Sequence, residues 1–168
     1  MNYERYRPQS GGFQLLPEVV KNLLIINGIM YLATVVLGNT IDLVNKLGLH
    51  YYTSKDFQIY QLVTYMFMHG SMAHVFFNMF ALWMFGSAVE NVWGPKRFLT
   101  YYILTGLGAA VFHYGLVFFG ITPNYDSVLV GASGAVMGLL LAYGMLFPNN
   151  LLYLYFLALI IFTCVCLK

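Results

Sequence analysis

Charged side chains are scarce in this sequence. Eight Lys and Arg and six Asp and Glu make up only 8% of the 168 residues, whereas 60% are hydrophobic and the mean hydropathy is +0.72. A soluble globular domain carries about 25% charged residues, and a chain this short has no interior able to bury so many apolar side chains. The composition excludes an ordinary soluble domain and indicates a multi-pass membrane protein.

Clustered charge and cysteine are also lacking. The net charge is only +2 and is scattered along the chain, which excludes a nucleic-acid footprint and a basic block of the kind that grips anionic lipid. Of the two cysteines, Cys164 and Cys166, neither faces the other on a helix. With no neighbouring His or acid they make a poor metal site, so we expect no metal.

Long apolar runs dominate what remains and predict five transmembrane helices, each reaching across the ~30 Å hydrocarbon layer, at residues 23–37, 71–89, 98–119, 133–147 and 151–167. The first run is interpreted as a retained span, because no small-residue cleavage site follows it. Residues 38–60 are expected to lie on the membrane surface as a loop with a short amphipathic helix. The domain organisation is a polar cytoplasmic tail, 1–22, and one membrane domain, 23–168.

Positive charge is distributed unevenly between the two sides of this topology. With the N-terminus inside, the cytoplasmic cations are Arg5, Arg7, Lys21, Lys96 and Arg97, and the outer ones are Lys46, Lys55 and Lys168. The positive-inside rule therefore predicts a cytoplasmic N-terminus. Because no organelle-targeting leader is recognised, we expect a bacterial inner (plasma) membrane.

Three polar side chains stand at the starts of two predicted spans. His74 begins one span, Asn78 follows a helical turn later on the same face, and Ser133 begins the other. Both spans descend from the outer side, so the three side chains are expected at similar depth in an outward-opening cavity. Polar groups inside a membrane usually indicate a functional site. A serine nucleophile together with hydrogen-bond donors for an oxyanion is a set of groups that can catalyse acyl transfer.

Glycines accompany the serine in the segment 131–134, which reads GASG. Gly131 frees the backbone where an extended loop turns into the helix. Gly134, Gly138 and Ala142 give that helix a small face, which allows a neighbouring helix to approach closely.

The remaining polar and aromatic residues, and Ser133 when considered alone, are also compatible with purely structural roles. Ser133 alone resembles a packing residue, His69 is expected at the outer interface and His50 in the surface loop, and His113 fits either packing or a polar network. Glu90 is expected to pair with Lys96 or Arg97, and Trp83 and Trp93 to be lipid-facing or interfacial aromatics.

The combination is more specific than any of its parts. The stretch 60–70 (YQLVTYMFMHG) is followed by His74, Asn78-Met79, Gly86, Glu90 and Trp93-Gly94, and then by a G-x-S-G segment at 131–134. In this order and spacing the motifs resemble the rhomboid family of intramembrane serine proteases. The match extends from about the first span to Pro148.

The resemblance implies a fold, an activity and residue roles. The fold is all-α, a polytopic transmembrane helical bundle opening to water on the outer side. The activity is serine endopeptidase cleavage of transmembrane segments of other membrane proteins, within membrane lipid and without a cofactor. Ser133 matches the nucleophile, His74 and Asn78 match the oxyanion-stabilising side chains, and Gly131 and Gly134 match the motif glycines.

The resemblance also implies a general-base histidine on a sixth span packed against the serine helix. No histidine follows His113, and the sequence stops at Lys168 after the fifth predicted span. We therefore expect five spans with the sixth missing, as in a C-terminally truncated copy, and little activity. The small face of the serine helix is expected to lose its packing partner. His74 acting as the base is a weaker alternative.

Two other functions are compatible with the composition. A non-catalytic rhomboid-like protein would bind transmembrane clients and need none of the three site residues. A transporter is disfavoured, because no charged residue lies deep within a predicted span and no pair of interrupted helices is present.

Overall fold

The structure is a computed structural model that describes residues 12–121 and 128–148. Its elements are α1 (Glu18–Leu37), α2 (Leu43–Leu47), α3 (Gln61–Thr64), η2 (Tyr65–Phe67), α4 (Met72–Ala81), η3 (Leu82–Gly86), α5 (Ser87–Trp93), α6 (Pro95–Phe118) and α7 (Ser133–Leu146). Within these residues no strand is present, and one isolated bridge pairs Leu49 with Leu129. The expectation of an all-α helical bundle is confirmed.

Among residues 12–121 and 128–148, three helices are long and apolar enough to cross a membrane: α1, the continuous helix Met72–Trp93 formed by α4, η3 and α5, and α6. They correspond to the first three predicted spans, although α1 already begins at Glu18. The fourth predicted span is α7, whose 14 residues extend about 21 Å at 1.5 Å per residue. The predicted fifth span, with Cys164 and Cys166, lies outside the described residues.

Local sequence sets the starts of the spanning helices. Ser71 caps α4 by accepting a hydrogen bond from the His74 amide at 3.2 Å, as serine does at an N-cap. Gly94, at φ +79°, turns the chain between α5 and α6, and Pro95 occupies the first turn of α6, where its missing N–H costs nothing. The Met72–Trp93 span changes to π-helix over Leu82–Gly86.

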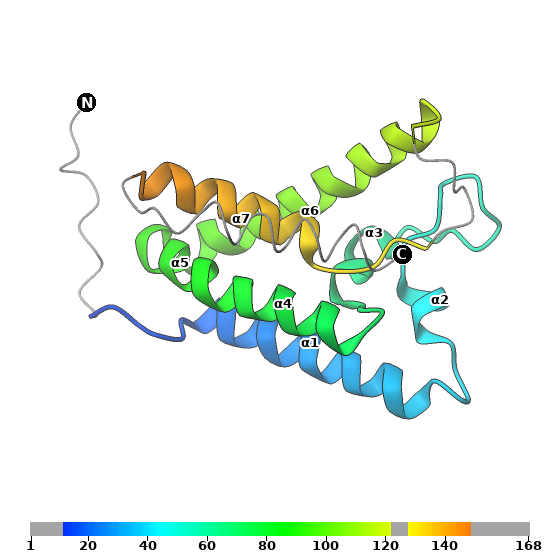
Figure 1. Cartoon of the computed structure of the whole chain (residues 1–168), viewed down its shortest axis with the longest axis horizontal. Helices are drawn as coiled ribbons and strands as arrows, with labels where there is room; N and C mark the ends of the chain where they lie inside the picture. The colour runs from blue at the N-terminus through cyan, green and yellow to red at the C-terminus, as the bar shows by residue number, and fades with distance from the viewer. Residues whose placement is uncertain (1–11, 122–127, 149–168) are drawn as a thin grey trace.

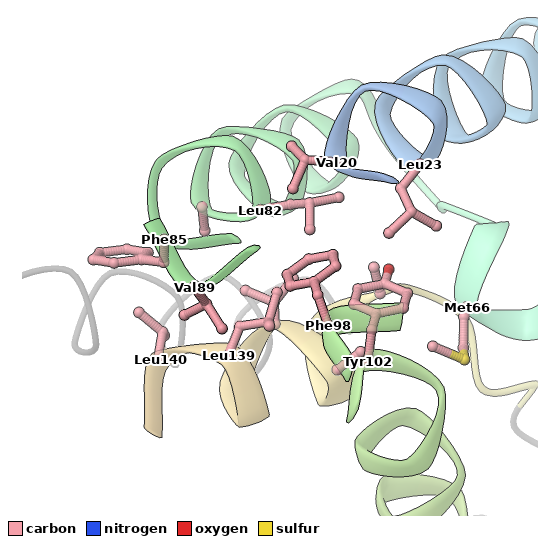
Figure 2. Packing of buried hydrophobic residues seen from close by; sticks show 14 of the residues in the cluster. Val20, Leu23, Met66, Leu82, Phe85, Val89, Phe98, Tyr102, Leu139 and Leu140 are labelled. Carbon is pink, nitrogen blue, oxygen red and sulfur yellow. The ribbon is translucent and has the colours of Figure 1, made fainter. Parts of the chain in front are cut away.

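The core lies where the spanning helices and α7 meet. In Figure 2, Val20 of α1, Leu82 and Val89 of the second span, Phe98 of α6 and Leu139 of α7 point toward one another, and all five are fully buried. In Figure 1 the α4–α5 helix lies between α1 and α7, and α6 packs against α7. The second span and α7 run in the same direction, so their N-termini share one end of the bundle.

The surface segment predicted at 38–60 contains the short helix α2, which Asp42 caps by accepting from the Asn45 amide at 2.9 Å. Its return to the bundle is organised by Gln61, which is 1% exposed. The Gln61 amide donates to the carbonyls of Lys46 at 3.2 Å and Asp56 at 3.0 Å. One buried amide thereby joins the middle of the loop, at Lys46, and its later part, at Asp56, to the start of α3.

Candidate active site

His74 is positioned by the first turn of α4. The Ser71 cap fixes where the helix starts, so the imidazole projects from the N-terminal end of the second span and is half-buried. Asn78 follows one turn later and is 4% exposed. Its Nδ2 donates to the His74 carbonyl at 3.0 Å, which uses one of the two N–H groups of that amide and leaves the other without a partner among the described residues.

The loop that leads into Ser133 is held from two sides. Leu129 and Leu49 exchange backbone hydrogen bonds of 2.9 Å in each direction, and the Gly131 amide donates to the Tyr65 carbonyl at 2.9 Å. Gly131 has φ +116°, a conformation that glycine adopts without steric cost. These contacts fix the approach of the chain to the first residue of α7.

Gly131 also lies directly against the side chain of His74. A Cβ added at this position would lie 2.7 Å from both Cε1 and Nε2 of His74, so the imidazole packs directly on the glycine α-carbon. The structure therefore brings His74 together with the 131–134 segment, as the shared outer end of the two spans predicts. Gly131 is required there by space as well as by backbone conformation.

Ser133 is the first residue of α7 and is half-buried. At that position its backbone N–H has no partner within the helix, and it points outward at the end of the helix that favours negative charge. Among the described residues the Ser133 hydroxyl makes no hydrogen bond. Ser133 thus begins a helix two residues after the glycine on which the His74 imidazole packs, and a helix N-terminus next to such a donor can stabilise an oxyanion formed at that serine.

The small face of α7 packs against α6. A Cβ added at Gly134 would clash with the Cβ of Ala109, and one added at Gly138 would lie 2.6 Å from the Cβ of Thr105. The Tyr101 hydroxyl of α6 also donates to the Gly138 carbonyl at 2.8 Å. The expectation that this face lacks its partner is wrong, because α6 already occupies the groove that the two glycines leave.

Comparisons with known proteins identify the family of the chain. The sequence model of the Rhomboid domain matches residues 56–168, more than half of the chain. The chain belongs to the rhomboid family. It is 34% identical over 82 residues to rhomboid protease AarA of Providencia stuartii, covering 44% of this chain and 29% of AarA.

Two further relatives show the breadth of the family. Rhomboid protease GluP of Bacillus subtilis is 38% identical over 81 residues, which cover 48% of this chain and 14% of GluP. The mitochondrial presenilin-associated rhomboid-like protein of Homo sapiens is 36% identical over 98 residues, which cover 58% of this chain and 25% of that protein. The chain thus spans less than half the length of the curated relatives it matches.

Histidines other than His74 take different places in this rhomboid. His69, expected at the interface, is 1% exposed, and its ring meets the His74 ring edge-on at a centroid distance of 5.0 Å. Burial, and next the neighbouring His74, lower the pKa of His69 to about 4, while the Phe67 backbone opposes the shift. His50 is 7% exposed, with Nε2 2.7 Å from the Asn45 carbonyl, and His113 is half-buried on α6.

Glu90 does not form the expected pair with Lys96 or Arg97. Its two carboxylate oxygens accept from the backbone amides of Val19 at 3.0 Å and Val20 at 2.8 Å. Glu90 is 3% exposed and thereby caps the N-terminus of α1, whose own preceding residue, Pro17, provides no side-chain cap. A carboxylate at this position stabilises both the free amides and the helix dipole.

Sequence reasoning missed the supporting residues of this rhomboid site. Tyr65 accepts the Gly131 amide through its carbonyl and donates its hydroxyl to the Gly106 carbonyl at 2.7 Å. Gln61 holds the surface loop. Both residues lie in the stretch 60–70 that carries the family resemblance. The side-chain amide of Gln61, placed directly before an apolar run, was the sequence feature that could have indicated a buried structural role.

Proposed function

We propose that this chain provides the nucleophile and the oxyanion-stabilising groups of an intramembrane serine endopeptidase. Ser133 Oγ attacks the carbonyl carbon of a peptide bond, and the side chains of His74 and Asn78 and the Ser133 backbone N–H donate to the resulting oxyanion. The observation that carries the proposal is the packing of the His74 imidazole on Gly131, two residues before Ser133. This contact supports a site in which nucleophile and donors lie close together.

The proton of the Ser133 hydroxyl must pass to a base as the new C–O bond forms. The four histidines of the chain are His50, His69, His74 and His113, and none follows Ser133. With His74 assigned to the oxyanion, we propose that the 168-residue polypeptide by itself cleaves slowly. Serine proteases without their triad retain about 10³–10⁴-fold catalysis over water from oxyanion binding.

Transmembrane segments of other membrane proteins are the proposed substrates. The proposed nucleophile stands at the end of an apolar helix, beside a span of membrane-crossing length. Relatives from Providencia stuartii and Bacillus subtilis carry the name rhomboid protease. A substrate carbonyl at the ends of these helices would meet Ser133 at the membrane boundary.

The test is cleavage of a model transmembrane substrate by the purified 168-residue protein in liposomes, with added imidazole as an external base. We expect slow cleavage that imidazole accelerates, that Ser133→Ala abolishes and that Ser54→Ala, in the surface loop, leaves unchanged. Fast Ser133-dependent cleavage without imidazole would overturn the proposed slowness. Absence of any Ser133-dependent cleavage with imidazole would overturn the protease proposal.

A non-catalytic role is the second candidate, because the Ser133 hydroxyl has no hydrogen-bonded base within the described part of the chain. In that case the bundle binds transmembrane clients without cutting them. Crosslinking to a model transmembrane helix would then be as strong in Ser133→Ala as in the wild type, and imidazole would release no product. Crosslinking that requires a protease substrate sequence would contradict this candidate.

We propose a bacterial inner membrane location with a cytoplasmic N-terminus. Support comes from the capping of α1 by Glu90, which places the N-terminal end of α1 on the same side as the α5–α6 turn. Cations of both segments then share the cytoplasmic side, as the positive-inside rule favours. Membrane-impermeant thiol labelling of Lys55→Cys and Arg97→Cys, with Cys164 and Cys166 replaced by Ser, tests this: in intact cells only Lys55→Cys should react.

A further inference from the structure

A wide-open, shallow cavity of about 480 Å³ lies at the start of α6, away from the candidate active site. It is lined by Trp93, Lys96, Arg97, Thr100, Tyr101 and Leu104. This volume is within the ~300–1,000 Å³ range of small-molecule sites. The function proposed above makes no use of it.

The position of the cavity fixes its depth in the membrane. Its lining residues begin on either side of the turn at Gly94, which joins the two spanning helices Met72–Trp93 and Pro95–Phe118. A turn between consecutive spans lies at a bilayer surface. The lining residues then follow α6 inward from that surface, because positions 97, 100, 101 and 104 share one face of a helix.

Both cations at the mouth of the cavity are exposed. Within residues 12–121 and 128–148, neither Lys96 nor Arg97 has a carboxylate partner, and the nearby Glu90 is occupied by the amides of α1. Two uncompensated cations next to each other raise the local potential and attract an anion. Arg in particular presents a planar fork that fits phosphate oxygens.

The wall of the cavity is preformed and apolar. The rings of Trp93 and Tyr101 meet edge-on at a centroid distance of 5.0 Å, and the Tyr101 hydroxyl is fixed on the Gly138 carbonyl of α7. Further along α6, Leu104 is 61% exposed at a depth where its surroundings are hydrocarbon. The cavity therefore changes from cationic to apolar over two helical turns.

We propose that this cavity binds an anionic phospholipid, with the phosphate held by Lys96 and Arg97 and an acyl chain lying along Leu104. The order of the lining residues matches that of the lipid, from headgroup to hydrocarbon. Basic pockets at the membrane surface bind anionic headgroups in this way. The sequence contains no basic run, and it is the cavity around two adjacent cations that makes the site.

The two tryptophans of the chain, Trp83 and Trp93, allow a direct test. In a Trp83→Phe background Trp93 is the only tryptophan, and the full chain is placed in phosphatidylcholine vesicles with a small, equal fraction of acyl-brominated phosphatidylglycerol or phosphatidylcholine. We expect the anionic lipid to quench Trp93 at least twofold more strongly. Lys96→Gln with Arg97→Gln should equalise the two lipids, and each single substitution should lower the ratio.

Matched controls separate a site from general attraction. Lys46→Gln and Lys55→Gln, in the surface loop, should leave the quenching ratio unchanged, and Trp93→Phe, which retains Trp83, should show no preference between the lipids. A preference that survives loss of both cations would overturn the proposal. Removal of the preference by inorganic phosphate, but not by sodium chloride of equal ionic strength, would assign the site to a soluble phosphate instead and also overturn it.

Discussion

The imidazole of His74 packs on the α-carbon of Gly131, where an added methyl group would lie 2.7 Å from both Cε1 and Nε2. This contact joins the second span to the loop that leads into α7. It also makes Gly131 the most demanding position of the candidate site, because its φ of +116° independently favours glycine.

Gly131→Ala is expected to lower the free energy of unfolding by about 2–4 kcal/mol, the combined cost of an unfavourable backbone conformation and an overpacked contact. Unfolding in mixed detergent micelles, followed by circular dichroism, measures this. Gly108→Ala is the matched control, since a Cβ there meets nothing within 4 Å; it should be neutral or slightly stabilising. Equal stability of the two variants would contradict the contact.

Glu90→Gln is expected to destabilise the protein by about 1.5–3 kcal/mol, the range for hydrogen bonds to a charged group. The reason is that a neutral amide offers a single, weaker acceptor to the amides of Val19 and Val20, which the carboxylate now satisfies. The same unfolding assay applies. Glu18→Gln, an exposed position in the first turn of α1, should change stability by much less.

The first three spans were predictable because hydropathy is a local property of the sequence, and the position of His74 relative to Asn78 follows from helical spacing. The role of Glu90 was not predictable, since its partners Val19 and Val20 lie 71 and 70 residues away. Lys96 and Arg97, which are close to Glu90 in the sequence, were the expected partners instead. The glycines of α7 correctly indicated a close helix contact, but composition does not say which helix makes it.

The candidate site was also predictable only in part. The G-x-S-G segment and the pair His74 and Asn78 could be recognised in the sequence as motifs. The Tyr65 carbonyl that accepts the Gly131 amide is a backbone group. Every residue type has this group, so the amino-acid sequence could not indicate the hydrogen bond. His69 was expected at the interface because histidine is polar, yet the loop that precedes α4 folds it against His74 and buries it.

His69 makes stability dependent on pH. Its folded pKa of about 4 lies below the ordinary value of 6.5, so the unfolded chain binds more protons between these values. Stability is therefore complete above pH 6.5 and falls as the pH decreases toward 4, by at most about 3 kcal/mol. Unfolding of wild type and His69→Phe at pH 7.5 and pH 5 measures this: the loss at pH 5 should be smaller in His69→Phe.

The contact between α6 and α7 can be tested by exchanging a methyl group across it. Gly134→Ala should destabilise the protein by about 1–3 kcal/mol through overpacking against Ala109. Ala109→Gly, which removes the opposing methyl group, should recover part of that loss when combined with it, so the double-mutant cycle should show a favourable coupling. Gly144→Ala on the same helix, with nothing within 4 Å of the added Cβ, should show no coupling to Ala109→Gly. Strictly additive effects at Gly134 and Ala109 would mean that these two helices do not meet at this pair, and the arrangement of α7 against α6 would have to be revised.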